Sequence, residues 1–356
     1  MTHKFGLLFV LWLLLVSPQL AACAGVQPSY PIQDTGLHAD QSRSELVWLD
    51  NHRLRFYGYR VGEPQGPEFH GVPRLIGADY YIWDTDANRV VTDPSLEGAM
   101  RICVQGDVLT FLKQSPADPS KRLVVTREKG QETVTPLGNP EWFNRFSCRY
   151  YDQKPEWDHG HLSLPLLDEH GSLFWNGGIS GRNTQIVFYS PSDTKGAALP
   201  ISTREAWPGL TRYVPFQHAY LLWGYSHIDK KTGTEFPYIP PNKAQTVWWL
   251  TPDGRVTEQE TPVRSWMRKQ EYYAIRDGLF VASRGITDLG DPGVAGGYIL
   301  KPGTEQKLIS GLLENVVVAP DGCKVAFIHD PYTQEPFFQR INIKIISICQ
   351  KAHHAR

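Results

Sequence analysis

The stretch from Asn315 to Asp330 reads NVVVAPDGCKVAFIHD, two apolar runs separated by Pro-Asp-Gly. Each run is rich in β-branched and aromatic residues, which favour strands over helices. Asp321 and Gly322 tolerate the positive φ that a short hairpin turn requires. The stretch therefore predicts a β-hairpin whose first strand is Asn315–Ala319.

The same rhythm of short apolar runs and turn residues continues backwards through the chain to Glu45. The runs fall into six groups of four, the last group holding only three. The apolar anchors of the second runs lie 47 to 63 residues apart, at Phe56, Phe111, Phe174, Leu222, Phe280 and Phe327. A repeat of this size is typical of β-propeller blades, which must stack because one sheet cannot bury its apolar face alone. A pair of packed sheets is the rival architecture, and it explains a repeated four-strand rhythm less well.

We therefore predict an all-β fold, a six-bladed β-propeller of four-stranded antiparallel blades, over residues 45–350, followed by a short tail at 351–356. Six strands are expected to be the innermost ones: Glu45–Asp50, Met100–Val104, Phe146–Tyr151, Arg212–Pro215, Glu271–Arg276 and Asn315–Ala319.

One blade also carries a family signal. Ala319 to Phe327, APDGCKVAF, resembles the PDG-x-x-[IV]-A-F core of the TolB-type, WD40-like propeller repeat. Leu250 to Val256, LTPDGRV, echoes the same motif. The resemblance implies a propeller fold, and it covers one blade.

The sixth group lacks a fourth strand, because only Gln350 to Arg356 follow its third run. An uncovered strand edge promotes aggregation, so a partner strand is required. We expect part of Ser29–Gln33, from the other end of the chain, to pair with the outer edge of Ile341–Cys349.

The N-terminus carries an export signal. Lys4 precedes an apolar stretch from Phe5 to Val16, which is too short for a stable membrane span. The residues LAAC at 20–23 resemble the bacterial lipobox, which implies cleavage before Cys23 and a lipid on its thiol. The alternative is an ordinary signal peptide, with Cys23 a bystander.

The lipobox resemblance divides the chain into a signal peptide at 1–22, a lipidated Cys23 with a flexible tether at 23–44, and the propeller. It implies a lipoprotein of a Gram-negative cell envelope, anchored to a membrane and facing the periplasm. Ala24 after the lipidated cysteine resembles the pattern for sorting to the outer membrane.

Four further cysteines follow Cys23, and their spacing does not resemble a zinc site. In an oxidising compartment they predict two disulfides, Cys323–Cys349 and Cys103–Cys148. Setting Cys323 opposite Cys349 in an antiparallel hairpin also sets Val325 opposite Ser347. The second bond would then join the innermost strands of neighbouring blades.

The balance of acidic and basic residues limits the kinds of partner that the chain can bind. Removal of the signal takes away Lys4 and leaves 35 basic residues against 37 acidic ones. This balance argues against nucleic-acid binding, which needs a basic face. The expected partners are the membrane, through the lipid, and an envelope protein or a small ligand.

Two groups of side chains are candidate binding sites. Tryptophans beside arginines could stack on sugars or hold an anion, although wedges between blades are the favoured interpretation. These residues are Trp142, Trp207, Trp266, Arg145, Arg212 and Arg268. His159 and His161 could ligate a metal, although a polar surface loop is the simpler explanation. No cofactor is expected, and no catalytic residue is assigned.

The sequence leaves two functions open. The first is a membrane-anchored binding or assembly module. The second is a periplasmic hydrolase or lyase for sugars or lactones, with its site at the channel mouth of the propeller.

Overall fold

The computed structural model describes residues 30–349 apart from seventeen intervening stretches. These are 40–45, 65–72, 106–107, 138–142, 145–148, 151–165, 169–170, 177–184, 191–195, 203–211, 225–226, 229–234, 237–245, 262–268, 286–292, 302–303 and 332–340. The chain divides into two units, Met1–Pro31 and Ile32–Arg356. All described secondary structure belongs to the second unit. It consists of β-strands and two 3-10 helices, η2 (Pro94–Leu96) and η5 (Pro215–Gln217). The prediction of an all-β chain is confirmed, and no helix in the described part is long and apolar enough to span a membrane.

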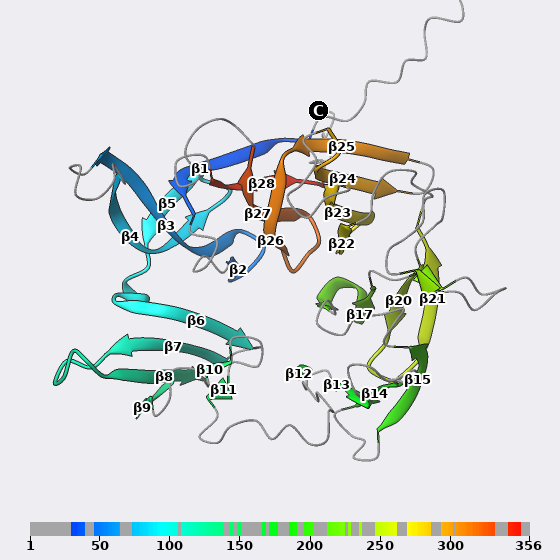
Figure 1. The fold of residues 1–356 in the computed structure, drawn as a ribbon, viewed down its shortest axis with the longest axis horizontal. Coiled ribbons are helices and arrows are strands. Elements are labelled where there is room, and N and C mark those ends of the chain that lie inside the picture. Colours follow the sequence, from blue (N-terminus) through cyan, green and yellow to red (C-terminus); the bar gives the residue numbers. More distant parts are fainter. Residues whose placement is uncertain are drawn as a thin grey trace, which may run out of the picture. The chain divides into compact units, whose positions relative to one another are not determined.

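Four sheets are antiparallel meanders of four strands (Figure 1). The first sheet comprises β6 (Ala99–Gln105), β7 (Val108–Gln114), β8 (Arg122–Glu128) and β9 (Gln131–Pro136), and the second comprises β12 (Leu166–Asp168), β13 (Gly171–Asn176), β14 (Gln185–Tyr189) and β15 (Ala197–Ser202). The third sheet comprises β16 (Arg212–Val214), β17 (Ala219–Leu222), β20 (Thr246–Leu250) and β21 (Val256–Glu260). The fourth sheet comprises β22 (Lys269–Ile275), β23 (Gly278–Gly285), β24 (Gly296–Lys301) and β25 (Thr304–Ser310). Two short pairs accompany them, β10 (Phe143–Asn144) with β11 (Arg149–Tyr150) and β18 (His227–Ile228) with β19 (Glu235–Phe236).

An eight-stranded sheet joins the two ends of the chain. Its order is β26-β27-β28-β1-β3-β4-β5, with β2 also beside β3. The strands are β1 (Ile32–His38), β2 (Val47–Trp48), β3 (Arg53–Pro64), β4 (Pro73–Asp84), β5 (Arg89–Thr92), β26 (Leu312–Val318), β27 (Lys324–Asp330) and β28 (Asn342–Ser347). We call it the closing sheet.

The strand β1 pairs with the outer edge of β28, for which the sequence predicts no C-terminal partner strand. Ile32 faces Ile346 of β28, and at the other end His38 faces both Asn342 of β28 and Tyr59 of β3. The prediction that part of Ser29–Gln33 pairs there is confirmed for Ile32 and Gln33, and the strand continues beyond that range to His38. The strand takes up residues that were assigned to the tether, because the free edge of β28 needs hydrogen-bond partners.

The third predicted group needs a correction. Its first strand is Leu166–Asp168, not Phe146–Tyr151, and Arg149–Tyr150 instead pairs with Phe143–Asn144. Asp168 faces Gly171 across a two-residue connection. Closing so short a loop costs less chain entropy than the long connection from Tyr151 would.

Buried apolar clusters join successive sheets. The members between β4–η2 and the β6–β9 sheet are Tyr80, Leu96, Ile102, Phe111 and Val125. Those between the β12–β15 and β16–β21 sheets are Ile186, Phe188, Leu199, Ile201, Tyr220, Leu222, Trp248 and Leu250. Those between the β16–β21 and β22–β25 sheets are Val214, Leu221, Trp223, Val247, Tyr272, Ala274, Leu279, Val281, Tyr298 and Leu300. Phe280 stacks on Phe327 and so joins the β22–β25 sheet to the closing sheet.

The closing sheet has its own core, which holds its N-terminal and C-terminal strands together. The members are Leu37, Ala39, Leu46, Leu54, Phe56, Trp83, Ala326, Ile328, Ile341, Ile343 and Ile345. Burial of this apolar surface is what stabilises the union of the two chain ends.

A buried ion pair lies at the end of β5. Arg55 Nε lies 2.8 Å from Asp93 Oδ2, with side-chain exposures of 12% and 3%. The other carboxylate oxygen of Asp93 accepts hydrogen bonds from the backbone N–H and the hydroxyl of Ser95, and so caps η2. The pair therefore fixes the start of the connection to β6.

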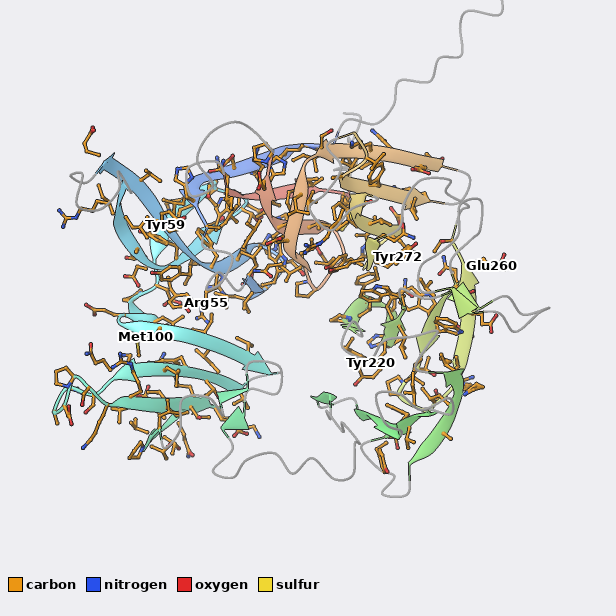
Figure 2. The ribbon with its side chains drawn as sticks, viewed as in Figure 1. Arg55, Tyr59, Met100, Tyr220, Glu260 and Tyr272 are labelled. Carbon is orange, nitrogen blue, oxygen red and sulfur yellow. A yellow bond between two sulfur atoms is a disulfide. The ribbon has the colours of Figure 1, made fainter. Side chains whose placement is uncertain are left out.

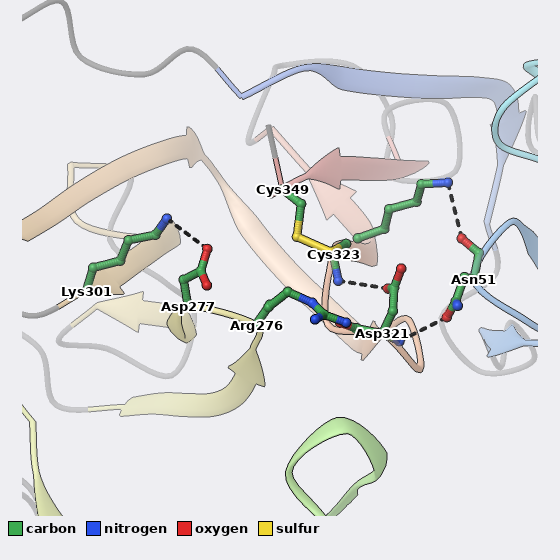
Figure 3. Close-up of a disulfide and its surroundings, with 8 residues drawn as sticks. Asn51, Arg276, Asp277, Lys301, Asp321, Cys323 and Cys349 are labelled. Carbon is green, nitrogen blue, oxygen red and sulfur yellow. Dashed lines mark hydrogen bonds and ion pairs between the residues drawn. A yellow bond between two sulfur atoms is a disulfide. The ribbon is translucent and has the colours of Figure 1, made fainter. Parts of the chain in front are cut away.

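The Pro-Asp-Gly turn between β26 and β27 contacts turns from two other parts of the fold (Figure 3). The backbone N–H of Asp321 donates to Asn51 Oδ1 at 2.9 Å, and Arg276 N–H donates to Gly322 O at 3.0 Å. Gly322 has a φ of +75°, and a Cβ there would lie 2.7 Å from the Phe216 ring and 2.8 Å from Arg276 N. The motif thus needs glycine for both conformation and close approach.

The predicted disulfide Cys323–Cys349 is present (Figure 3). The predicted register is wrong by one residue, because Val325 faces Ile346 rather than Ser347. Two residues, Ile348 and Cys349, both donate to Cys323 O, at 2.8 and 3.4 Å. This extra residue beyond β28 acts as a bulge and brings Cys349 to Cys323. Cys148 and the side chain of Cys103 lie outside the described residues, so their pairing stays a prediction.

Candidate functional site

Most of the predicted site residues lie outside the described part of the chain. They are Cys23, Trp142, Trp207, Trp266, Arg145, Arg268, His159 and His161. Arg212 begins β16, but its side chain lies outside the described residues as well. All of these assignments stay predictions.

The described residues present a different candidate, the far end of the β3–β4 hairpin. Figure 2 shows Arg55 and Tyr59 along β3, before this end. Beyond them, Arg60 faces Ile76, Val61 faces Leu75 and Pro64 faces Pro73. We call residues 60–64 and 73–77 the ribbon.

The ribbon leaves the sheet because its neighbours stop short. The strand β1 meets β3 only at Tyr59, and β5 pairs with β4 only from Tyr81 to Asp84. The register also shifts between Gly58 and Arg60. A two-stranded ribbon is marginally stable in water by itself, so it gains from a partner.

Apolar side chains lie open on this ribbon. Leu75 is 46% exposed and Ile76 is 50% exposed, and as consecutive strand residues they lie on opposite faces. Each face of the ribbon therefore exposes one large apolar side chain, a candidate contact for a partner although isolated exposed apolar residues are common.

Positive charge accompanies the apolar groups. Arg60 and Arg74 are exposed, and neither forms an ion pair within the described residues. Glu63 is the acidic residue of the ribbon. Guanidinium groups beside apolar side chains suit a protein segment that presents carboxylates next to apolar residues.

A second polar cluster surrounds Glu314 on β26. Burial raises the pKa of its carboxyl, opposed by Arg284 and reinforced by the carboxylates of Asp330 and Glu271. Arg284 Nη2 lies 3.6 Å from Glu314 Oε1, and the hydroxyl of Tyr273 donates to Glu271. Within the described ranges, no group of three or more His, Cys, Asp or Glu residues could hold a metal ion.

His329 is a structural residue. Its side chain is buried, and Nε2 lies 2.7 Å from Ser310 O, so Nε2 donates and carries the proton. Burial lowers the pKa of this imidazole, although the bond to Ser310 opposes the shift. These contacts make His329 part of the hydrogen-bonded structure between β27 and Ser310.

Sequence reasoning missed the ribbon because Gly62, Pro64 and Pro73 mark a loop by the usual signals. The signal available was the apolar pair Leu75-Ile76 beside Val61, which extends the alternation of the flanking strands. The Glu314 cluster had no local signal, since its members come from four different strands.

No family model and no curated protein matches the sequence. Solved structures similar to this chain include the β-propeller domain of Cps50 (Swd1) from Myceliophteria thermophila, with 10% identity and a TM-score of 0.36, over 90% of this chain and all of that one. The WD40 domain of SCAP from fission yeast has 10% identity and a TM-score of 0.29, over 90% and 98% of the chains. A subtype N10 neuraminidase-like protein of the strain A/little yellow-shouldered bat/Guatemala/060/2010 has 9% identity and a TM-score of 0.28, over 89% of this chain and 99% of that one.

Proposed function

We propose that this chain is a bacterial envelope lipoprotein whose six-bladed β-propeller serves as a binding or assembly module for an envelope protein. The order in which the sheets pack supports the propeller. Successive sheets share buried apolar side chains at every junction except that between the β6–β9 and β12–β15 sheets, where the described residues form no shared cluster. The C-terminal strands join the N-terminal ones within the closing sheet. A succession of four-stranded meanders that returns to its start is the arrangement of propeller blades.

The ribbon carries the proposal of binding. Its exposed Leu75 and Ile76 lie beyond the strands that would otherwise cover them, as do Arg60 and Arg74, which form no ion pair with any described residue. The partner surface is expected to offer apolar groups flanked by carboxylates. Anchoring through Cys23 would keep the module at the membrane, where one lipid-bearing residue suffices for lasting attachment if more than one chain is added.

Retention of a partner by the purified mature domain tests the proposal. The variant Leu75→Ser/Ile76→Ser should lose a protein that the wild type retains from envelope extract. Val91→Ser/Val134→Ser is the matched control, because these valines are 45% and 50% exposed but lie on β5 and β9. Equal retention by both variants would show that the ribbon is not part of the binding surface.

One observation favours the alternative, an enzyme that acts on sugars or lactones. Glu314 is a half-buried carboxyl whose raised pKa suits a general acid. Hydrolysis of such substrates that disappears in Glu314→Gln, while the fold and the ribbon-dependent binding remain, would establish it. The absence of turnover in the wild type would leave Glu314 a structural carboxyl.

A further inference from the structure

The strand β1 is held in the closing sheet by an interrupted ladder. Residues of β28 face Ile32, Gln33 and Asp34, and the register then shifts before the next facing residue, His38. On its other side, β1 meets β3 within the described residues at one pair, His38 with Tyr59. The ladder between β27 and β28, by contrast, runs through six consecutive pairs. Hydrogen bonds therefore hold β1 less firmly than they hold β27.

The strand satisfies part of its own backbone where the ladder is interrupted. Asp34 Oδ1 accepts a hydrogen bond from the N–H of Gly36 at 2.9 Å, and Thr35 Oγ1 accepts one from the N–H of Leu37 at 3.0 Å. Turns of this kind close on the side chain two residues earlier, and they need no second strand. These two N–H groups therefore stay paired when β1 separates from β28.

Little of β1 is buried. Leu37 is the one buried residue of the strand, and Ala39 is buried just beyond its end. These two are among the eleven members of the closing-sheet core, and the other nine come from the rest of the sheet. Terminal strands with few buried contacts open locally at a lower free energy than global unfolding requires. The strand β1 can therefore separate while the other strands stay paired.

We propose that two copies of this chain exchange β1, so that β1 of each copy pairs with β28 of the other. A second copy offers the sequence that already fits this edge, residue for residue. The contact between Lys344 Nζ and Asp34 Oδ2, which lie 3.6 Å apart in one chain, forms twice between the copies. Reciprocal exchange leaves neither edge of β28 bare, and it gives a closed two-fold dimer.

The contacts of β1 are the same in the monomer and in the exchanged dimer, so they cancel from the equilibrium between the two. The equilibrium then depends on the loss of freedom on association and on the protein concentration. The rate of exchange depends on the local opening of β1. The exchange involves neither the ribbon nor the lipid anchor, so it is separate from the proposed binding surface.

Charge reversal at a facing pair tests the exchange. Asp34 faces Lys344, and neither belongs to the closing-sheet core. Asp34→Lys places two lysines opposite each other in the monomer, and Lys344→Asp places two aspartates there. A heterodimer of these two full-length variants sets lysine opposite aspartate at both exchanged strands. Copies with different affinity tags should therefore co-purify about tenfold more from the mixture of variants than from either variant alone.

The double variant Asp34→Lys/Lys344→Asp is the matched control, because it restores opposite charges within one copy. Its two tagged forms should co-purify no more than those of the wild type. Equal co-purification from the mixed single variants and from the separate ones would overturn the inference.

Cysteines locate the contact. Asp34→Cys in one copy and Lys344→Cys in the other should form a disulfide that joins two copies, because facing positions lie within reach of such a bond. Non-reducing peptide mapping identifies the 34–344 link. Val91→Cys, at an exposed position on β5, replaces Asp34→Cys as the control that should not link. Co-purification without the 34–344 link would mean that the copies meet at another surface, and it too would overturn the exchange.

Discussion

Ile32 in the first described strand faces Ile346 in the last. The pairing is antiparallel and continues through Gln33 and Asp34, opposite Ile345 and Lys344. The two ends of the domain are therefore held in one sheet by a hydrogen-bonded ladder and by the apolar core beneath it. Four predictions test what this union and its surroundings contribute.

Leu37→Ala should lower the free energy of unfolding by about 3 kcal/mol, because Leu37 is buried in the core of the closing sheet. Ile32→Ala is the matched control on the same strand. Ile32 is 44% exposed, so its truncation should change stability by less than about 0.5 kcal/mol. Urea unfolding of both variants decides the matter, and equal effects would mean that β1 is not docked.

Replacement of both disulfide cysteines, Cys323→Ser with Cys349→Ser, should cost about 3.5 kcal/mol by the chain-entropy model for a loop of this length. The sequence separation is 26 residues. The wild type should lose the same stability when unfolding is measured with a reductant, and the double variant should not respond to it. Free thiols at 323 and 349 in a non-reducing peptide map would contradict the pairing.

Arg55→Met should destabilise the domain by about 3–5 kcal/mol, because it leaves the buried carboxylate of Asp93 without its cation. Arg53→Met is the control two residues away on β3. Its ion pair with Asp50 is largely exposed, and such pairs contribute about 0–1 kcal/mol. Similar losses of stability in the two variants would show that another group compensates the charge of the Asp93 carboxylate.

His329 makes stability depend on pH. Burial lowers the pKa of His329 in the folded state below the ordinary 6.5, so the unfolded chain binds the proton more readily. The contribution is complete above the unfolded pKa, and it is lost as the pH falls from about 7 toward the lowered folded value. His329→Gln should reduce the loss of stability between pH 7 and pH 5, measured by urea midpoints; an unchanged loss would place its origin elsewhere.

Local patterning predicted the strands because each run contains its own signal. The predicted anchors Phe56, Phe111, Phe280 and Phe327 lie in β3, β7, β23 and β27, and Gly322 marked its turn correctly. The third group failed because two apolar runs, Phe146–Tyr151 and Leu166–Asp168, could both precede β13. Which of the two runs pairs with β13 depends on the cost of loop closure and on contacts with neighbouring sheets. The periodicity of the sequence carries no information about either.

The register of the disulfide hairpin and the exposure of the ribbon depend on contacts that the sequence does not reveal. The disulfide was predictable from cysteine number and hairpin proximity, but its register was not, because a bulge at Ile348 and Cys349 shifts the facing residues by one. The ribbon was hidden by prolines and glycines that a projecting hairpin tolerates and a covered strand would not.

The pairing of β1 with β28 also makes the domain sensitive to truncation. A ribosome releases the N-terminal strand first, and that strand must wait for residues 342–347 before its ladder can form. Contacts so distant in sequence form late. A chain that stops before β28 therefore leaves β1 without its ladder partner, and locally open segments of this kind are where proteases cut.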